Sequence, residues 1–306
     1  MTVARKPVVV IGSINMDLVA TSPRIPMAGE TLIGSNFVTT PGGKGANQAV
    51  AVARLGGAVS MLGMVGGDVF GSSLAEALRT AGVNTQAVER IDGPSGIASI
   101  AVAADGQNSI IVIPGANGRV TAEYLDRNAA IIQSAGIVLC QLELPLETVA
   151  HVLDLCSQFN VPAVLDPAPA APLPDTFWTR IAWFTPNETE AALYIGAGLS
   201  TEEAASRVLA RGVGGVVLKR GASGAYVAVR GGKAAWVPAF RVDAVDTVAA
   251  GDCFNGAFAV ALLDGLDPWA AARFASAAAA ISVTRHGAQA SMPTRADVDE
   301  FLALRG

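Results

Sequence analysis

Short apolar runs alternate with alanine-rich segments of helical period along most of the chain. The apolar runs predict buried strands at residues 8–11, 59–64, 137–141, 163–166, 182–185 and 216–219. The segments between and after them predict helices at residues 45–55, 74–81, 146–158, 200–211, 252–263 and 267–284. Strands and helices that alternate in this way are typical of an α/β fold in which helices cover both faces of a parallel sheet.

Two segments interrupt this alternation. Residues 97–104 and 107–113 are β-rich, and Asp105-Gly106 between them is a strong hairpin signal. Residues 18–40 lack a helical period and contain prolines and glycines. We expect these pieces, at about 18–40 and 97–113, to form a small accessory β-sheet. It would serve as a lid or an interface on a single domain of residues 1–306.

Composition narrows the class of protein. The chain has 306 residues with a net charge of −5. Its mean hydropathy is +0.44, yet the longest uncharged stretch, residues 128–142, is shorter than the roughly 20 residues of a spanning helix. No long basic run favours nucleic acid as a partner. Three widely spaced cysteines predict neither a disulfide framework nor a zinc site. We therefore expect a cytoplasmic protein with no membrane or nucleic-acid partner.

Residues 245–256 are the most informative segment. Small residues lead into a helix predicted to start near Asp252, where free backbone N–H groups and the helix dipole favour an anion. The small side chains at 249–251 would let a phosphate approach the backbone. Asp252 is then placed to take a proton from an attacking hydroxyl. The alternative is that Asp252 is only a helix N-cap.

A second glycine-rich segment covers residues 41–48, PGGKGANQ, and precedes a helix. It matches neither GxxxxGK[ST] nor GxGxxG. Glycines there would allow close backbone approach to a polar ligand, to which Lys44 and Asn47 would donate. The alternative is a tight strand-to-helix turn.

Three further polar groups follow predicted strands. Residues 185–190 are predicted to open a helix. Asn187 and Glu190 there could hold a hydrated Mg²⁺ near phosphates, or they could form a helix cap. Asn15 and Asp17 would point to the same side of an extended chain and suit vicinal hydroxyls, or they could lie in a solvated loop. Glu143 could add a hydroxyl contact.

Together these segments resemble the ribokinase-like carbohydrate kinase family, and the resemblance covers essentially the whole chain. In order, the matching segments are GSINMD at 12–17, PGGKGANQA at 41–49, QLELP at 141–145, DPAPA at 166–170, TPNETEA at 185–191, AVDTVAAGDCFNGA at 244–257 and TRHGAQASMP at 284–293. The AAGD and GGKGAN segments are specific to the family.

The resemblance implies a three-layer α/β/α sandwich with a mainly parallel sheet and a small β-sheet lid. It implies transfer of the γ-phosphoryl group of ATP to a sugar hydroxymethyl group, with the 5-hydroxyl of D-ribose as the leading acceptor. A kinase of 2-deoxyribose or of a nucleoside is the first alternative. A non-catalytic sugar-binding regulator is the second. The lid implies a homodimer.

Residue roles follow from the same resemblance. Asp252 is implied as the base, and the backbone amides of Ala249, Ala250, Gly251 and Asp252 as the anion hole. The implied sugar contacts are Ser13, Ile14, Asn15, Asp17, Gly42, Gly43, Lys44, Gly45, Asn47, Glu143 and Asp252. The implied nucleotide contacts are Asn187, Lys219, Arg220, Gly221, Ala222, Ser223, Gly224, Gly251, Asp252 and Ser276.

Two cations are implied as well. Mg²⁺ would be held through water by Asn187 and Glu190. A K⁺ activator would be held, mostly by backbone carbonyls, at Asp246, Val248, Ser282, Arg285, Gly287 and Ser291. The sequence departs from the family at two positions: Ser276 stands where a larger polar residue often faces the adenine, and Cys253 stands where threonine is common.

Overall fold

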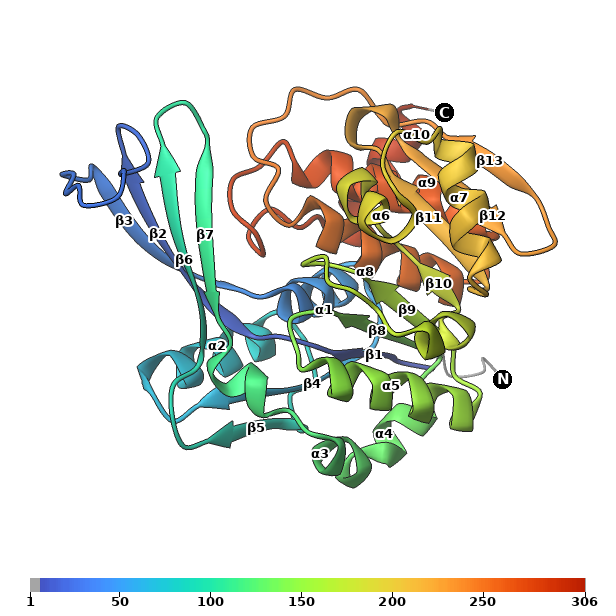
Figure 1. Cartoon of the computed structure of the whole chain (residues 1–306), viewed down its shortest axis with the longest axis horizontal. Helices are drawn as coiled ribbons and strands as arrows, with labels where there is room; N and C mark the ends of the chain where they lie inside the picture. The colour runs from blue at the N-terminus through green and yellow to red at the C-terminus, as the bar shows by residue number, and fades with distance from the viewer. Residues whose placement is uncertain (1–5, 306) are drawn as a thin grey trace.

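The computed structural model describes residues 6–305. Within them, nine strands form the main sheet in the order β13-β12-β11-β10-β9-β8-β1-β4-β5 (Figure 1). Neighbours from β11 to β5 run parallel, whereas β11, β12 and β13 are antiparallel. The strands are β1 (Val8–Ile11), β4 (Val59–Gly66), β5 (Val88–Ile91), β8 (Ile137–Gln141), β9 (Ala163–Asp166), β10 (Trp183–Phe184), β11 (Gly215–Lys219), β12 (Ala225–Val229) and β13 (Ala234–Val237).

Helices cover both faces of this sheet. One face carries α1 (Lys44–Arg54), α2 (Val69–Thr80), α8 (Ala250–Leu263), α9 (Pro268–Ser282) and α10 (Arg295–Ala303). The other carries α3 (Ala122–Arg127), α4 (Ala129–Ser134), α5 (Leu146–Phe159), α6 (Glu188–Ile195) and α7 (Thr201–Ala210). Short 3₁₀ turns lie at Gly115–Arg119, Asp175–Arg180 and Gly221–Ser223. The predicted three-layer α/β/α sandwich is confirmed.

The central strand β1 shows why the sheet must be covered twice. Successive side chains of a strand point to opposite faces. Val8 and Val10 join the core beneath α1 and α8, whereas Val9 and Ile11 join the core beneath α5. All four are buried. A continuous apolar run is therefore what this position requires.

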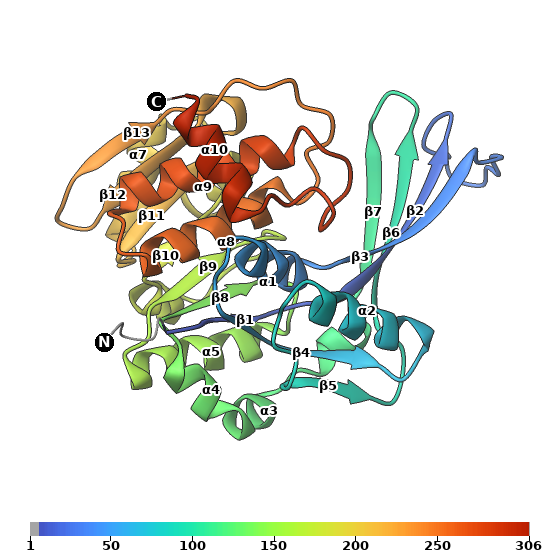
Figure 2. The ribbon, with the colours of Figure 1, turned by 180° about the vertical axis from the view of Figure 1, so that it is seen from behind.

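A second sheet projects from the body of the molecule, in the order β3-β2-β6-β7 (Figures 1 and 2). Its strands are β2 (Asn15–Ser22), β3 (Asn36–Gly42), β6 (Gly96–Ala103) and β7 (Asn108–Ile113). The predicted hairpin at Asp105-Gly106 is confirmed, because it joins the antiparallel strands β6 and β7. All six residues of β7 are exposed.

The structure corrects several sequence-based expectations. Strands β5, β12 and β13 and helices α3, α4 and α10 were not predicted, whereas the helix expected to open at residues 185–190 is confirmed as α6. β12 and β13 are joined by a short turn, which permits only antiparallel pairing. β2 begins at Asn15, so the alternative of a solvated loop at Asn15 and Asp17 is wrong. In the described residues, no helix is long and apolar enough to cross a membrane.

Candidate active site

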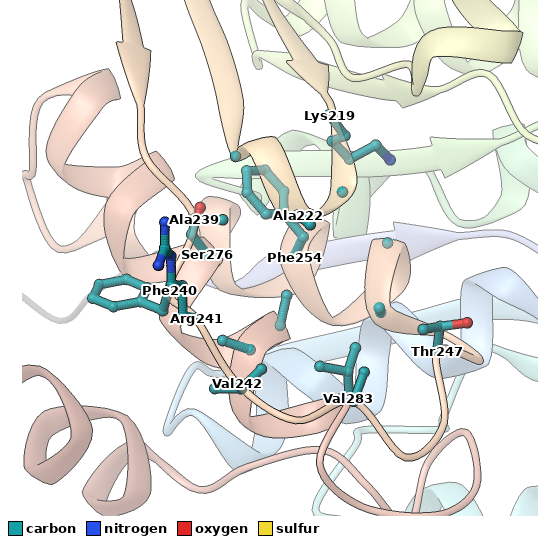
Figure 3. A pocket seen from close by; sticks show the side chains of 17 residues that line it. Lys219, Ala222, Ala239, Phe240, Arg241, Val242, Thr247, Phe254, Ser276 and Val283 are labelled. Carbon is teal, nitrogen blue, oxygen red and sulfur yellow. The ribbon is translucent and has the colours of Figure 1, made fainter.

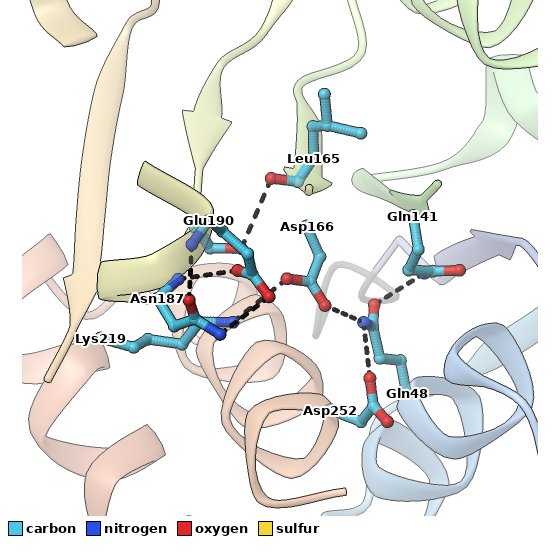
Figure 4. A network of polar contacts seen from close by, with 9 residues as sticks. Gln48, Gln141, Leu165, Asp166, Asn187, Glu190, Lys219 and Asp252 are labelled. Carbon is cyan, nitrogen blue, oxygen red and sulfur yellow. Dashed lines mark hydrogen bonds and ion pairs between the residues drawn. The ribbon is translucent and has the colours of Figure 1, made fainter. Parts of the chain in front are cut away.

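The chemistry-bearing segments meet beyond the carboxyl ends of β1, β8, β9 and β11, where open parallel sheets place their ligands. Helices α1 and α8 begin at the same edge and contribute the remaining groups (Figure 4). Segments that are more than two hundred residues apart in sequence are thereby in contact, since Asn47 and Asp252 share a hydrogen bond.

Asp252 lies in the first turn of α8 and is only 5% exposed. The N-cap of this helix is Ala249, in the left-handed conformation with φ of 58°. The alternative in which Asp252 is only the N-cap is therefore wrong. The carboxylate accepts hydrogen bonds from Asn47 Nδ2 at 3.0 Å and from Gln48 Nε2 at 3.1 Å.

The start of α8 also presents unused donors. The Ala250 amide is bonded to the Thr247 carbonyl and the Cys253 amide to that of Ala249. Between them, the amides of Gly251 and Asp252 have no protein acceptor among residues 6–305. A left-handed alanine is a strained conformation of the kind concentrated at functional sites. Here it begins a helix whose free N–H groups suit an anion.

Burial and charge act in opposite directions on Asp252. Desolvation raises the pKa of its carboxyl group, and the negative charge of Asp166 adds to that rise. The Lys44 ammonium and the amide donors of Asn47 and Gln48 lower it again. A carboxylate with a raised pKa is a stronger proton acceptor than an ordinary aspartate.

The Gly42-Gly43 pair lets the strand that precedes α1 lie against the start of β2. A Cβ at Gly42 would overlap the Asp17 carboxylate, and one at Gly43 would lie 2.7 Å from the backbone nitrogen of Asn15. Gly43 also has a φ of 88°, which favours glycine. The segment is a tight strand-to-helix turn, as the alternative had it, and it lies in the wall of the site.

The expected sugar-contact residues gather in front of this turn. Burial, together with the neighbouring carboxylates of Glu143 and Asp252, raises the pKa of Asp17 to about 7. Glu143 accepts from the hydroxyl of Ser13 and from the backbone amide of Lys44 at 3.1 Å. The Gly45 amide donates to Ser13 Oγ at 3.4 Å.

Two of these expected contacts are engaged elsewhere in the protein. Asn15 Oδ1 accepts from Asn117 Nδ2 at 2.6 Å. The Ile14 side chain lies in the core, and its backbone amide donates to Asn117 Oδ1 at 2.9 Å. Asn117, which the sequence did not single out, therefore fixes the start of β2 at the site.

Two cavities meet at the start of α8. The first, of about 340 Å³, is polar, and its walls include Lys44, Asp166, Asn187, Glu190, Lys219 and Asp252. The second, of about 600 Å³, is mainly apolar (Figure 3). Its walls include Ala222, Phe240, Val242, Phe254, Ser276 and Val283. Lys219, Gly221, Thr247, Ala250 and Gly251 line both, so a charged compartment and an apolar one share a wall.

The segment 219–224 forms part of that wall. Lys219 ends β11 and pairs with the buried Asp166 at 3.1 Å. Gly221 and Gly224 have positive φ, and a Cβ at Gly224 would overlap the Val237 carbonyl. Arg220 pairs with Glu188 at 3.2 Å, and neither it nor Ser223 lines either cavity.

Asn187 and Glu190 form a capping box at the start of α6, as the alternative to the magnesium reading had it. Asn187 Oδ1 accepts from the Glu190 amide at 2.8 Å, and Glu190 Oε2 accepts from the Asn187 amide at 2.7 Å. Both side chains also line the polar cavity. Burial raises the pKa of Glu190, and the Lys219 ammonium opposes that rise. A capping role and a ligand role are compatible, since a carboxylate oxygen has two lone pairs.

The residues expected at the monovalent-cation site come from two segments that the structure joins. Asp246 Oδ1 accepts from the Val248 amide at 3.0 Å, and Oδ2 accepts from the Gly287 amide at 2.9 Å. The buried hydroxyls of Ser282 and Ser291 lie 3.1 Å apart. The Arg285 guanidinium pairs with Asp297 at 3.2 Å, which leaves only its backbone for a cation.

Comparison with known proteins places the chain in a family. The sequence profile of the pfkB family of carbohydrate kinases matches residues 5–295. The chain belongs to the pfkB family of carbohydrate kinases.

Known proteins also align along nearly the full length of this chain. Ribokinase of Bacillus subtilis is 45% identical over 96% of this chain and 98% of its own. Deoxyribokinase of Salmonella typhi is 38% identical over 97% of this chain and 99% of its own. A solved structure of Arabidopsis thaliana ribokinase complexed with ribose and ATP has a TM-score of 0.92 and 36% identity. It covers 97% of this chain and 98% of the other.

Sequence reasoning missed three polar side chains of this pfkB site, namely Gln48, Gln141 and Asp166. All three are buried and bonded to one another: Gln48 donates to Asp166 Oδ2 at 3.0 Å, and Gln141 donates to Gln48 Oε1 at 2.8 Å. A signal was present, because Gln141 and Asp166 each end a predicted strand. Their partners could not be identified without the fold.

Proposed function

We propose that the protein phosphorylates D-ribose at O5, with ATP as the donor and D-ribose 5-phosphate and ADP as products. The observation that carries the proposal is the buried carboxylate of Asp252 beside the two free amides at the start of α8. The start of α8 borders both the polar cavity and the apolar one, since Ala250 and Gly251 line each of them. The ribokinase of B. subtilis and the Arabidopsis ribokinase with bound ribose and ATP support the same activity.

In this mechanism Asp252 accepts the proton of the ribose 5-hydroxyl as that oxygen bonds to the γ-phosphorus of ATP. The bond from the γ-phosphorus to the β–γ bridging oxygen breaks, and its electron pair leaves with ADP. The amides of Gly251 and Asp252 donate to the transferring phosphoryl oxygens, the role of an anion hole. Lys219 supports them, because its ammonium lies 3.5 Å from where a Cβ of Gly251 would be.

Each cavity has a role in the proposed reaction. Asp17, Asn47 and Glu143 would hold the ribose hydroxyls, with Gly42 and Gly43 giving the sugar close access to the backbone. The apolar cavity beside Phe254 and Ser276 would hold the adenine, with residues 219–224 along the phosphates. A mainly apolar wall suits the faces of a flat base.

The residues of the polar cavity fit a magnesium ion held through water. In residues 6–305, no group of three or more His, Cys, Asp or Glu side chains could hold a metal by itself. Mg²⁺ keeps several waters and binds through few carboxylates together with substrate phosphates. Asn187 and Glu190 would hold those waters, and the ion would offset charge on the phosphates.

We also propose that a monovalent cation, K⁺, binds beside Asp246, whose carboxylate accepts from the Gly287 amide and so joins residues 284–293 to the loop that leads into α8. Bound there, it would fix the loop that presents the anion-hole amides. Replacing K⁺ with Na⁺ should lower activity, and Asp246→Ala should abolish the difference. Equal rates of the unmodified protein in the two salts would remove the cation from the proposal.

We also propose a homodimer formed through the accessory sheet. Its outer strands expose large apolar side chains, namely Phe37, Val38, Ile110, Ile111, Val112 and Ile113. A second copy would cover them. Sedimentation of the unmodified protein should give twice the mass of one chain, and sedimentation of Ile111→Glu should give the mass of one chain. A monomeric unmodified protein would overturn this proposal.

A cytoplasmic location stays a prediction.

A kinase of 2-deoxyribose is the second candidate, because the Salmonella typhi deoxyribokinase aligns along almost the whole chain. ADP release should be measured with MgATP and KCl, comparing D-ribose, 2-deoxyribose, fructose and adenosine. Preferential turnover of D-ribose is the expected result. Preferential turnover of 2-deoxyribose or adenosine would move the function to that alternative. Ribose binding without turnover of any acceptor would favour the non-catalytic regulator, against which the buried Asp252 argues.

A further inference from the structure

The side-chain amide of Gln48 lies between two buried carboxylates (Figure 4). Gln48 is on α1 and is fully buried. Its Nε2 donates to Asp252 Oδ1 at 3.1 Å and to Asp166 Oδ2 at 3.0 Å. An amide nitrogen has two hydrogens, so each carboxylate takes one of them.

The orientation of this amide is fixed from the other side. Gln48 Oε1 accepts from Gln141 Nε2 at 2.8 Å. Gly12 leaves room for that contact, since a Cβ there would overlap Gln141 Oε1. If the Gln48 amide were flipped, its carbonyl oxygen would face both carboxylates and lose all three hydrogen bonds. The chain from Gln141 through Gln48 therefore has one orientation.

We propose that Gln48 is a positioning residue for phosphoryl transfer, whose two amide hydrogens bridge Asp252 and Asp166 and so hold the Asp252 carboxylate in place as the base. The inference rests on the proposed function, in which Asp252 is the base. Gln48 acts only through Asp252 and touches neither sugar nor nucleotide in this role.

The charges around Asp252 show why such a bridge is needed. Asp166 faces it from the end of β9, and Asp17 faces it from β2. The Lys44 ammonium on α1 opposes them, and Lys219 on β11 pairs with Asp166. Cys253, the next residue on α8, is a buried thiol whose pKa burial raises to about 12, so it is neutral. Two carboxylates in one desolvated site repel each other, so the Asp166 charge raises the pKa of Asp252 and donors between the two oppose that rise.

The bridge also links four elements of the site, namely α1, α8, β9 and β11. Asp166 holds Lys219 through its other oxygen at 3.1 Å. Gln48 therefore connects the start of α8, through Asp166, to the Lys219 ammonium at the end of β11. A shift of Gln48 would move Asp252 and, at the same time, weaken the contact between Asp166 and the Lys219 ammonium. A side chain that served only as core packing would not have this double effect.

The test compares Gln48→Met, which keeps the length of the side chain and removes its donors, with Gln158→Met, an exposed position on α5. In the pH profile of kcat/KM for ribose, the midpoint of the acid limb should move to a higher pH by about one unit or more in Gln48→Met. This is the size expected for the loss of a hydrogen bond to a charged group. Gln158→Met should match the unmodified protein. An unmoved acid limb in a folded Gln48→Met protein would overturn the proposal, however much kcat falls.

A double variant tests the bridge itself. Adding Asp166→Asn to Gln48→Met removes the repelling charge, so the acid limb should return toward its original position. If it stays as high as in Gln48→Met alone, Gln48 does not act between the two carboxylates. Should Gln48→Met fail to fold, Gln141→Leu frees the same amide and should move the limb in the same direction by a smaller amount. An unmoved limb there would count against the proposal.

A direct titration separates this inference from the proposed function. Asp17 also has a pKa near neutrality, so the Asp252 carboxyl carbon should be followed by ¹³C NMR in the unmodified protein and in Gln48→Met. A rise in the Asp252 pKa without ribose turnover by the unmodified protein would support the bridge and refute the ribose kinase. Turnover with no change in that pKa would refute the bridge alone.

Discussion

The two cavities that share the start of α8 differ in the side chains that line them: charged groups line one, and apolar groups line most of the other. In the polar cavity, side chains of Lys44, Asp166, Glu190, Lys219 and Asp252 are crowded together, and each charge has a partner or a donor nearby. In the apolar cavity, alanine, valine and phenylalanine side chains dominate the wall, with Ser276 as one of the few polar groups. The same helix terminus borders both.

The difference shows how each half of the proposed reaction is controlled. Charges in a desolvated space interact strongly, so small displacements or lost donors should change the rate. An apolar wall holds a base mainly through contact area, so affinity should depend on shape. Substitutions in the polar cavity should therefore change kcat, and those in the apolar cavity should change KM for the nucleotide.

The largest effect should come from Asp252→Asn. Loss of the base should lower kcat by at least about 10²-fold, while ribose binding, measured by calorimetry, is retained. Near-normal turnover in this variant would exclude Asp252 from the mechanism. It would also contradict the expectation that substitutions in the polar cavity change kcat.

The next effect concerns Asp17 and the sugar. If its carboxylate accepts from the 2- and 3-hydroxyls, kcat/KM for ribose should exceed that for 2-deoxyribose by about tenfold or more, because a buried acceptor is left unpaired. Asp17→Asn should narrow that ratio. Equal use of both sugars by the unmodified protein would show that Asp17 does not hold the 2-hydroxyl.

On the apolar side, Ala280 of α9 also lines the cavity. Ala280→Phe should raise KM for ATP by about tenfold, because the larger ring occupies the space proposed for the base. The kcat and the KM for ribose should stay close to those of the unmodified protein. Ser276→Ala is the matched control, and its effect on KM for ATP should be at most about fivefold, the size of one neutral hydrogen bond. A change in kcat alone would contradict this division of roles.

The last prediction concerns stability rather than catalysis. The pKa of Asp17 is raised to about 7 in the folded protein, and an unfolded aspartate titrates near about 4. The folded state therefore binds more protons between these values, and this contribution to stability is lost as the pH rises from about 4 through 7. Denaturant unfolding at pH 5 and pH 8 should show a fall that Asp17→Asn lacks. The same fall in both proteins would assign it to other groups.

The sequence predicted the layered α/β fold because strands such as 8–11 are apolar on both faces and the helices between them are periodic. It also predicted the hairpin at Asp105-Gly106, where the local turn chemistry suffices. It failed at β12, β13 and α3, which are short and lack a distinctive period. The Asn187–Glu190 capping box was one of two alternatives, since a capping signal and a ligand signal use the same residue types.

What the sequence determined by itself is local: which segments are buried, where the chain turns, and which polar residues stand at strand ends and helix starts. The tertiary structure alone decided that Gln48 lies between Asp166 and Asp252, and that Asn117 holds Asn15. Such contacts join residues about a hundred or more positions apart. Their energy depends on the desolvation of the whole site, which exists only when the strand ends and both helix starts have been brought together.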